Sequence, residues 1–409
     1  MEVTLTTIIK ARELLNNSIN FPKKKIEKVK INNAIDRISA KNIKSKFNLP
    51  QTKNSAVDGY AISYYDIKNN LTQKYQVAGI AKAGHPFSKK ITKNQAIEIY
   101  TGAIMPKGLD CVVMHENTKK IGKDIKIIKL PEKGLNVRPA GENVRINEKI
   151  IEKGKKITAP YIGQLSASGN SEIEVYKKLN VSIFSTGDEV INPTKNLKMG
   201  QIYDANRPML LSMLNNKNIN LNDEGIVRDD LEILTKKYEK SIERNDLVIS
   251  SGGASDGIED HTQNALKKIG AKLIFWQLAI KPGKPIAVAK YKKTLIFCLP
   301  GNPVAAYVCC KLLIKPAIEK ISGTNFHEPF HVFLPSGFEH KKRLGRTEFL
   351  RCKIVTKNKT SKIFLHGRRG AGVISSLTDA DGLVELPNDI KNVKEGQLLK
   401  FLPFSDISL

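Results

Sequence analysis

The sequence predicts a multidomain protein of the α/β plus β class. From residue 178 to about residue 322, short apolar segments typical of strands alternate with helical segments, which indicates parallel βαβ units in a three-layer domain. After about residue 326 the helical pattern stops, and the remaining strand-like segments predict a compact all-β module. A chain of 409 residues is long enough for roughly two to four domains with their own cores.

The part of the chain before residue 178 predicts less regular structure. Residues 5–17 and 29–43 have the pattern of helices, whereas residues 47–63, rich in Pro, Asn and Ser, predict an ordered loop. Short β-rich segments separated by Gly and Pro predict a small β domain over residues 73–130. Residues 144–174 predict mixed structure with one helix in the segment APYIGQLSASG.

Polar turns follow each predicted strand of the α/β region. Ligands of open α/β sheets bind beyond the carboxyl ends of the strands, so we expect these turns to gather at one edge of the sheet and form a site. The turns are residues 185–189, 228–230, 250–260, 281–285 and 300–303.

The segment VISSGGASDGIEDH, residues 248–261, combines features that oppose each other. Its strand-to-glycine turn offers backbone N–H groups that suit a phosphate or another oxyanion. Its carboxylates, Asp256, Glu259 and Asp260, would repel a phosphate unless a divalent cation lay between them. Mg²⁺ is typically held by one or two carboxylates together with substrate phosphates. The segment therefore predicts a phosphate bridged by a metal ion.

Each of these turns also allows a purely structural interpretation. Asp229 with Asp230, and Glu259 with Asp260, can cap the helices that follow them, and both interpretations stay open. Lys281 and Lys284 suit an oxyanion, but each alone would be a solvated surface residue. The turn 300–303, Pro-Gly-Asn-Pro, is either a strand–helix connector or a rigid wall of a selective site. His261 is expected on a helix surface.

Charge and composition exclude several classes of function. The net charge of +27 comes mainly from lysines spread along the chain, and aromatic residues are only 6%, so we expect no specific nucleic-acid binding. No segment has the length and apolarity of a membrane span, and no export signal precedes the first helix, so a cytoplasmic location and no membrane partner are expected. The five cysteines include no C-x-x-C pair, which predicts reduced thiols and no zinc site.

At this point the motifs can be compared with a known family. Together they resemble the MoeA family of molybdopterin molybdenumtransferases, which is also represented in the E domain of gephyrin. The resemblance extends over nearly the whole chain, with the motifs in the family's order. The segments are NSAVDGYAI (54–62), YTGAIMPKGLDCVVMHE (100–116), FSTGDEV (184–190), GQIYDANRPML (200–210), ISSGGASDGIEDH (249–261), LAIKPGKP (278–285) and CLPGNPVAAYV (298–308).

The resemblance implies an activity. The expected substrates are adenylylated molybdopterin and molybdate; molybdate is inserted, the pyrophosphate bond is hydrolysed and AMP leaves, with Mg²⁺ as the assisting cation. The expected state is a homodimer, with the upstream adenylyltransferase and recipient molybdoenzymes as further partners. Two alternatives remain: a molybdopterin-binding scaffold without catalysis, against which the acidic set argues, and a molybdopterin adenylyltransferase, against which the insert and the barrel argue.

The resemblance also implies four domains. They are a discontinuous elongated N-terminal domain (1–45 and 144–176), an inserted β-rich domain (46–143), an α/β molybdopterin-binding domain (177–325) and a C-terminal β-barrel (326–409). The SAVDGYA and TGA loops of the insert are expected to face the α/β site of the partner chain.

Site residues carry over position by position. The expected catalytic residues are Asp58 and Thr101 of the insert, Glu189, Asp229 and Asp260 around the pyrophosphate and the metal, and Lys281 and Lys284 facing molybdate. The expected metal ligands are Asp229 and Asp260. The expected substrate-binding residues are Ser251, Gly252, Gly253, Pro285, Pro300, Gly301, Asn302, Pro303, Arg351 and Ser375, with Ser376 as the alternative to Ser375. Gln277 and Asn143 depart from the family pattern, in which Lys and Asp are frequent at these positions.

Overall fold

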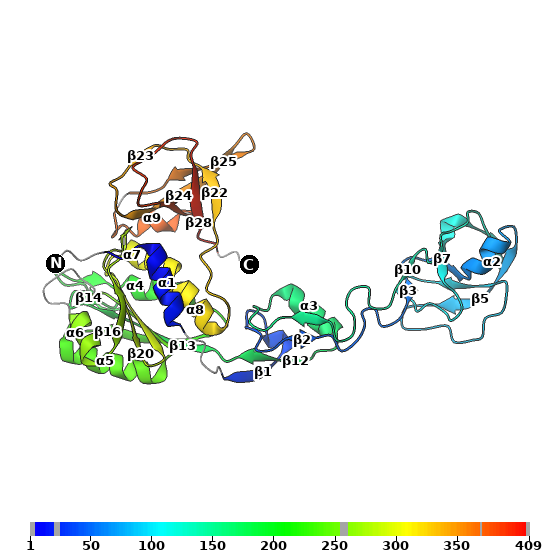
Figure 1. Ribbon diagram of the computed structural model, residues 1–409, viewed down its shortest axis with the longest axis horizontal. Coiled ribbons are helices and arrows are strands. Elements are labelled where there is room, and N and C mark those ends of the chain that lie inside the picture. Colours follow the sequence, from blue (N-terminus) through cyan, green and yellow to red (C-terminus); the bar gives the residue numbers. More distant parts are fainter. Residues whose placement is uncertain (1–4, 20–24, 254–260, 369, 406–409) are drawn as a thin grey trace. The chain divides into compact units, whose positions relative to one another are not determined.

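The computed structural model describes residues 5–19, 25–253, 261–368 and 370–405 (Figure 1). The chain forms two compact units. The first unit contains residues 1–27, 36–40 and 176–409, and the second contains residues 28–35 and 41–175. Within the described residues, no helix is both long and apolar enough to cross a membrane.

A six-stranded mixed sheet forms the centre of the first unit, in the order β16-β13-β17-β21-β20-β18. The strands are β13 (Leu179–Thr186), β16 (Ile219–Val227), β17 (Leu247–Ser251), β18 (Lys272–Trp276), β20 (Ala287–Tyr291) and β21 (Thr294–Leu299). The pairs β13–β16, β13–β17 and β17–β21 are parallel, as predicted. The pairs β20–β21 and β18–β20 are antiparallel, so the expectation of parallel βαβ units throughout was wrong for this edge.

The reason for the antiparallel edge lies in two short connections. A tight turn joins Tyr291 to Thr294, and so short a link can only reverse the chain. The apolar segment 272–280 does not form one strand. It breaks at Gln277, whose φ of 58° is left-handed, and residues Ile280–Lys281 form β19, which joins another sheet.

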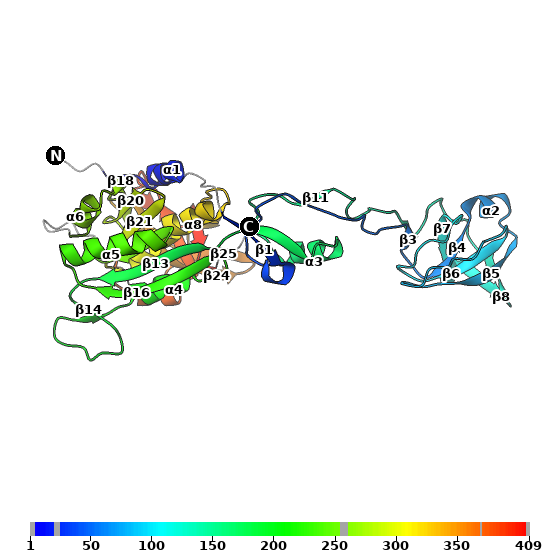
Figure 2. The same cartoon turned by 90° about the horizontal axis from the view of Figure 1, so that it is seen from below.

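Helices cover both faces of this sheet and make it the middle of three layers (Figures 1 and 2). On one face the core includes residues of α1 (Ile8–Ser18), α4 (Asn206–Leu214), α7 (Pro303–Cys309) and α8 (Lys315–Ser322). On the other face α5 (Leu231–Arg244) and α6 (His261–Lys268) bury Leu234, Tyr238 and Leu266. Figure 2 shows the link between β14 (Val190–Ile191) and β15 (Ile202–Tyr203) as a loop extending from the sheet.

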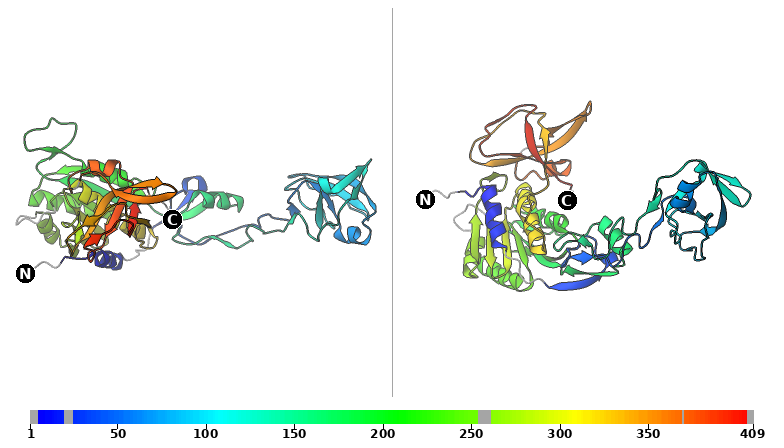
Figure 3. Two further views of the ribbon diagram at one scale, coloured as in Figure 1. Left: turned by 90° about the horizontal axis from the view of Figure 1, so that it is seen from above. Right: turned by 45° about the vertical axis from the view of Figure 1, so that its right-hand side comes forward.

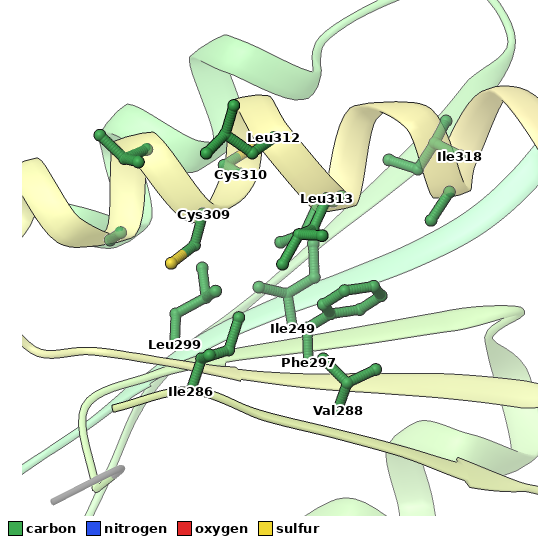
Figure 4. Packing of buried hydrophobic residues seen from close by; sticks show 14 of the residues in the cluster. Ile249, Ile286, Val288, Phe297, Leu299, Cys309, Cys310, Leu312, Leu313 and Ile318 are labelled. Carbon is green, nitrogen blue, oxygen red and sulfur yellow. The ribbon is translucent and has the colours of Figure 1, made fainter. Parts of the chain in front are cut away.

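One long helix contains a proline without breaking. Residues 303–322 run continuously from α7 through a π-helical segment, Cys310–Ile314, into α8. Pro316 has no N–H and its ring would collide with a carbonyl one turn earlier, and the wider π turn lies immediately before it. Cys309 still lies over Leu299 and Ile286 of the α/β core, and Leu313 lies over Ile249 and Phe297 of the sheet (Figure 4).

The C-terminal strands build a second six-stranded sheet, in the order β19-β24-β26-β28-β22 with β25 paired to β24. Besides β19, its strands are β22 (Val332–Pro335), β24 (Thr347–Lys357), β25 (Thr360–Leu365), β26 (Gly382–Leu386) and β28 (Leu398–Pro403). The strands β23 (His340–Lys341) and β27 (Asn392–Val393) pair with each other, and α9 (Ser375–Thr378) is a short helix before β26. In Figure 3 this sheet, orange to red, lies over the end of the α/β part at which the yellow helix α7 begins. A hydrogen bond from Val304 N to Ala371 O, 3.0 Å long, joins the two parts there.

The second unit contains another six-stranded sheet, in the order β7-β4-β6-β5-β9-β8. Its strands are β4 (Gly59–Ile62), β5 (Lys74–Ala81), β6 (Gln95–Ile99), β7 (Cys111–Met114), β8 (Thr118–Ile121) and β9 (Asp124–Ile127), with helix α2 (Tyr64–Asn69) beside them. A smaller apolar cluster contains Leu165 of α3 (Ala159–Ala167) and Ile151. The short strands of this unit are β2 (Ile43–Lys44), β3 (Asn54–Ser55), β10 (Val137–Arg138) and β11 (Lys149–Ile151), which pair as β2–β11 and β3–β10.

Two of the N-terminal helix predictions can be judged directly. The helix predicted at 5–17 is confirmed as α1, where the side chain of Thr7 caps the N-terminus by accepting from Lys10 N. The helix predicted at 29–43 was wrong, because Ile26–Lys30 forms β1, paired with β12 (Glu172–Tyr176), and Ile31–Asn33 is one 3-10 turn. Along β1 the residues alternate between exposed and half-buried, which is the period of a strand.

The multidomain α/β plus β class is therefore confirmed. The four domain boundaries stay a prediction.

Candidate functional site

Four polar turns lie at the carboxyl edge of the central sheet. Because β13, β16, β17 and β21 are parallel, the turns after them meet at one edge. These turns, 187–189, 228–230, 252–253 and 300–303, are called the rim below. The turn 281–285 lies at the same edge, because it enters β20 at Ala287, which pairs with Cys298 near the end of β21.

Two glycines let the backbone of the rim pack closely. Gly252 has a φ of 96°, donates its N–H to Leu299 O at 3.1 Å, and would place a Cβ only 2.0 Å from Thr186 O. Gly253 has a φ of 69°, and its Cβ would lie 2.4 Å from Thr262 Oγ1. A side chain at either position would collide, so this part of the rim requires glycine.

Asn206, at the start of α4, ties two turns of the rim together. Its Nδ2 donates to Ser251 Oγ at 2.7 Å and to Gly301 O at 2.8 Å. Ser185 and Arg207 likewise donate to the buried carboxylate of Asp204 at 3.0 and 2.9 Å. The motif DANRP by itself predicts no role for these residues, since nothing in it shows that they meet the turns after β17 and β21.

Two adjacent aspartates in the acidic part of the rim, Asp229 and Asp230, have different environments. Asp230 caps α5, because its Oδ1 accepts from Ile233 N at 2.9 Å. Asp229 is half-buried, and its Oδ1 has no hydrogen-bond partner among the described residues. Burial and the nearby carboxylates of Asp188 and Glu189 raise the pKa of Asp229, and His261 opposes this shift. The capping interpretation thus holds for Asp230. Asp229 has instead a raised pKa, which a cation bound beside its carboxylate would lower.

Other predicted acidic residues are less defined. Glu189 lies in the first turn of the rim, where a Cβ on Gly187 would be 2.7 Å from Glu189 Oε2. Asp256, Glu259 and Asp260 lie outside the described residues. Three buried side-chain atoms next to the rim also have no hydrogen-bond partner in the part of the chain that the structure describes: Thr186 Oγ1, Asn206 Oδ1 and Thr262 Oγ1.

A cavity of about 780 Å³ lies between the turn 281–285, the start of α7 and the C-terminal strands. Pro285, Pro300 and Asn302 line it; Pro303, the first residue of α7, does not. Its cationic lining residues are Lys281, Lys284, Lys341, Lys342, Arg343, Arg346 and Arg351. Among the lining residues that the structure describes, Glu348 is the single carboxylate. This cationic cavity therefore suits an anion.

The turn that carries both predicted lysines is packed tightly on α7. Gly283 has a φ of 116°, and a Cβ there would lie 2.9 Å from Cys309 Sγ. Lys281 belongs to β19 and pairs in register with Glu348 of β24, and its Nζ donates to Glu348 Oε1 at 3.0 Å. Glu348 Oε2 lies 3.1 Å from His340 Nε2. Neither Glu348 nor His340 was singled out from the sequence.

Arg351 is buried at the back of the cationic cavity. Its Nε donates to Ser376 Oγ at 2.9 Å, and one terminal nitrogen donates to Arg368 O at 3.0 Å. Of the two serines considered from the sequence, Ser376 is the one that holds Arg351, whereas Ser375 is exposed at the start of α9.

In the second unit, Asp58 and Thr101 form a direct pair. Asp58 Oδ1 accepts from Thr101 N at 2.7 Å and from Thr101 Oγ1 at 2.8 Å. These two hydrogen bonds lower the pKa of the Asp58 carboxyl, which therefore remains an ionised and exposed anion. The two residues, which were named from separate motifs, thus belong to one cluster of the second unit.

Comparisons with known proteins cover almost the entire chain. Residues 6–169 match the family model for the MoeA N-terminal region (domain I and II), residues 182–320 match a “Probable molybdopterin binding domain”, and residues 334–404 match the MoeA C-terminal region (domain IV). A protein of Haemophilus influenzae named molybdopterin molybdenumtransferase is 33% identical over 98% of this chain and 100% of its own length. One of that name from Staphylococcus epidermidis is 28% identical over 91% and 89%. A crystal structure of the molybdopterin biosynthesis MoeA protein from Pyrococcus horikoshii has a TM-score of 0.84 at 27% identity, covering 98% of this chain and 100% of that one.

Proposed function

The chain belongs to the MoeA family, and we propose that it inserts molybdate into adenylylated molybdopterin, hydrolyses the pyrophosphate bond and releases AMP. It is a transferase of molybdenum cofactor biosynthesis, as its relatives are named. The observation that carries the proposal is the position of a cationic cavity beside a glycine-rich rim that contains a partly buried aspartate. A substrate with a pyrophosphate and a second substrate that is a small oxyanion need these two environments next to each other.

The rim suits the pyrophosphate. Gly252 and Gly253 hold the backbone of the rim in a left-handed turn that packs against Thr186 and Thr262, where a side chain would collide. Ser251 lies beside them, oriented by Asn206, and the turn of Pro300, Gly301, Asn302 and Pro303 forms the next wall.

Mg²⁺ fits the acidic side of the rim. Asp229 has a buried carboxylate oxygen without a hydrogen-bond partner among the described residues, and its pKa is raised by burial and by neighbouring carboxylates, both of which a cation would relieve. Asp229, with Asp260, would hold the ion. The ion would neutralise negative charge on the pyrophosphate oxygens. Glu189 would orient the pyrophosphate from the adjoining turn.

The cationic cavity suits molybdate. Lys281 and Lys284 of one turn and Arg351 of β24 offer ammonium and guanidinium donors from two segments, and Pro285 and Pro300 stiffen the walls. A rigid site loses less conformational entropy when it binds a small anion.

The proposal includes a homodimer in the cytoplasm. The proposal also includes the finer fold of the protein, with an inserted β domain and a C-terminal β-barrel. The proposed partners are an upstream adenylyltransferase and recipient molybdoenzymes. We expect the Asp58–Thr101 pair to complete the site of the partner chain. A mixture of Asp58→Ala and Asp260→Ala chains, each inactive alone, should then recover activity, because one of the two sites of a heterodimer is intact. Absence of recovery after verified subunit exchange would contradict this arrangement.

The decisive experiment supplies adenylylated molybdopterin, molybdate and Mg²⁺ and measures the nucleotide product. Release of AMP that depends on molybdate supports the proposal. Binding without turnover would indicate the scaffold alternative, and pyrophosphate release from molybdopterin and ATP would indicate the adenylyltransferase.

A further inference from the structure

Glu348 is an unexpected residue in a cavity that suits an anion. It is 6% exposed, and it is the single carboxylate among the described lining residues. A carboxylate at this place repels a bound oxyanion, so on charge alone it should weaken the site. The hydrogen bonds of Glu348 indicate what this residue contributes to the cationic cavity.

Glu348 joins two side chains that come from different segments. Oε1 accepts from Lys281 Nζ at 3.0 Å, and Oε2 lies 3.1 Å from His340 Nε2 on β23. Burial opposes ionisation of Glu348, but the hydrogen bonds from His340 and Lys281 outweigh it and lower the pKa of the carboxyl below its ordinary value. The residue is therefore a fixed anion with both oxygens engaged.

Lys281 has the opposite character. Its side chain is 60% exposed, whereas that of Glu348 is 8% exposed, so a flexible surface lysine is attached at its tip to a rigid, buried carboxylate. An ammonium group has three N–H donors, and the bond to Glu348 uses one of them. The others stay available toward the cavity from a defined position. Freezing a free lysine side chain at the moment of binding would cost entropy, which this anchoring has already removed.

We propose that Glu348, held by His340, is a positioning residue that fixes the ammonium group of Lys281 for binding of the tetrahedral oxyanion. This inference rests on the proposed function, since it assigns molybdate to the cationic cavity. It differs from a simple counter-ion role in the sign of one measurable effect. A counter-ion weakens oxyanion binding, so its removal strengthens binding. A positioning residue strengthens binding, so its removal weakens binding although a negative charge is lost.

The test is calorimetric titration of the full-length protein with molybdate alone. We expect Glu348→Gln to raise the molybdate Kd about fivefold to tenfold, the size of the effect of ordering one long side chain. Glu348→Asp keeps the charge but is too short to reach both partners, and it should raise the Kd similarly. Glu385→Gln is the matched control: Glu385 is a largely buried carboxylate of the same sheet, paired with Lys400 and not part of the cavity lining, and its removal should leave the Kd unchanged.

A double-mutant cycle separates positioning from general destabilisation. In a Lys281→Ala background, Glu348→Gln should no longer raise the molybdate Kd, because there is no ammonium group left to position. Tighter molybdate binding by Glu348→Gln, or an equal loss with and without Lys281, would overturn the inference while leaving the proposed function intact. Failure of the wild-type protein to bind molybdate would overturn both.

Discussion

The rim and the cationic cavity lie at the same edge of the central sheet, yet the pKa of a carboxylate is shifted in opposite directions in the two places. At the rim, Asp229 has a buried oxygen without a partner among the described residues, and its pKa is raised, chiefly by burial. In the cavity, Glu348 is more deeply buried, but hydrogen bonds with His340 and Lys281 lower its pKa. Burial alone therefore does not set the state of a carboxylate; the partners that the fold supplies do. The rim carboxylate has an oxygen without a hydrogen-bond partner among the described residues, whereas both oxygens of the cavity carboxylate have partners within the chain.

The largest effect should come from the rim carboxylate. Asp229→Asn removes the charge that would hold Mg²⁺, and we expect turnover to fall about a hundredfold or more, which is typical when a metal or charge-stabilising contact is lost. The adjacent Asp230→Asn is the matched control, because Asp230 caps α5 and should retain most of the activity. Equal activity of the two variants would show that Asp229 is not part of the site.

The next effect should come from the cavity. Lys281→Ala is expected to raise the molybdate concentration for half-maximal activity by about tenfold, the effect of losing one charge-assisted hydrogen bond. Binding of the adenylylated pterin should stay nearly unchanged, because the rim is intact. Lys362→Ala, which removes an exposed ion pair between Lys362 of β25 and Glu395 in the turn before β28, serves as the control. An equal loss of affinity for both substrates would contradict the division between rim and cavity.

A smaller effect should show whether Asp230 is a helix cap or a residue of the functional site. Asp230→Ala removes the side-chain acceptor of Ile233 N, and we expect a loss of about 1 kcal/mol in the free energy of unfolding. Chemical denaturation at neutral pH measures it. A loss of turnover without a loss of stability would reverse the roles that we assign to the two aspartates.

The smallest effect concerns pH. Because the folded-state pKa of Asp229 is raised, its protonated form favours the folded state; this contribution is complete below the ordinary aspartate pKa and is lost as the pH rises through the raised value. Without Mg²⁺, the wild type should therefore lose stability relative to Asp229→Asn across that interval. Thermal melts of the two proteins at a series of pH values test this, and a constant difference would contradict it.

The parts of the molecule that sequence predicted well are local ones. The alternation of strands and helices after residue 178 needs only periodicity, and the turn at Gly252 and Gly253 needs only the local backbone. The turns at the ends of parallel strands could be brought together because parallel pairing implies a shared edge. The helix predicted at 29–43 was wrong because β1 pairs with β12, a strand far along the chain that no local pattern reveals.

The parts that sequence missed depend on pairings across long separations. Lys281 and Glu348 lie 67 positions apart, and only the pairing of β19 with β24 makes them neighbours. Asn206 meets Gly301 over 95 positions, through the packing of α4 beneath two turns. No spacing rule links such residues, so the glycines and lysines of the site could be named while their orienting partners could not.

The two-residue strand β19 also determines when the cavity can exist. Its partner β24 is made 66 positions later, so a chain still leaving the ribosome can complete the α/β sheet before it can fix Lys281 against the C-terminal sheet. The rim can therefore form during synthesis, whereas the cationic cavity forms only when the C-terminal strands have folded. A nascent or truncated chain would thus lack a complete cationic cavity. Binding of the oxyanion would then be a property of the full-length folded protein alone.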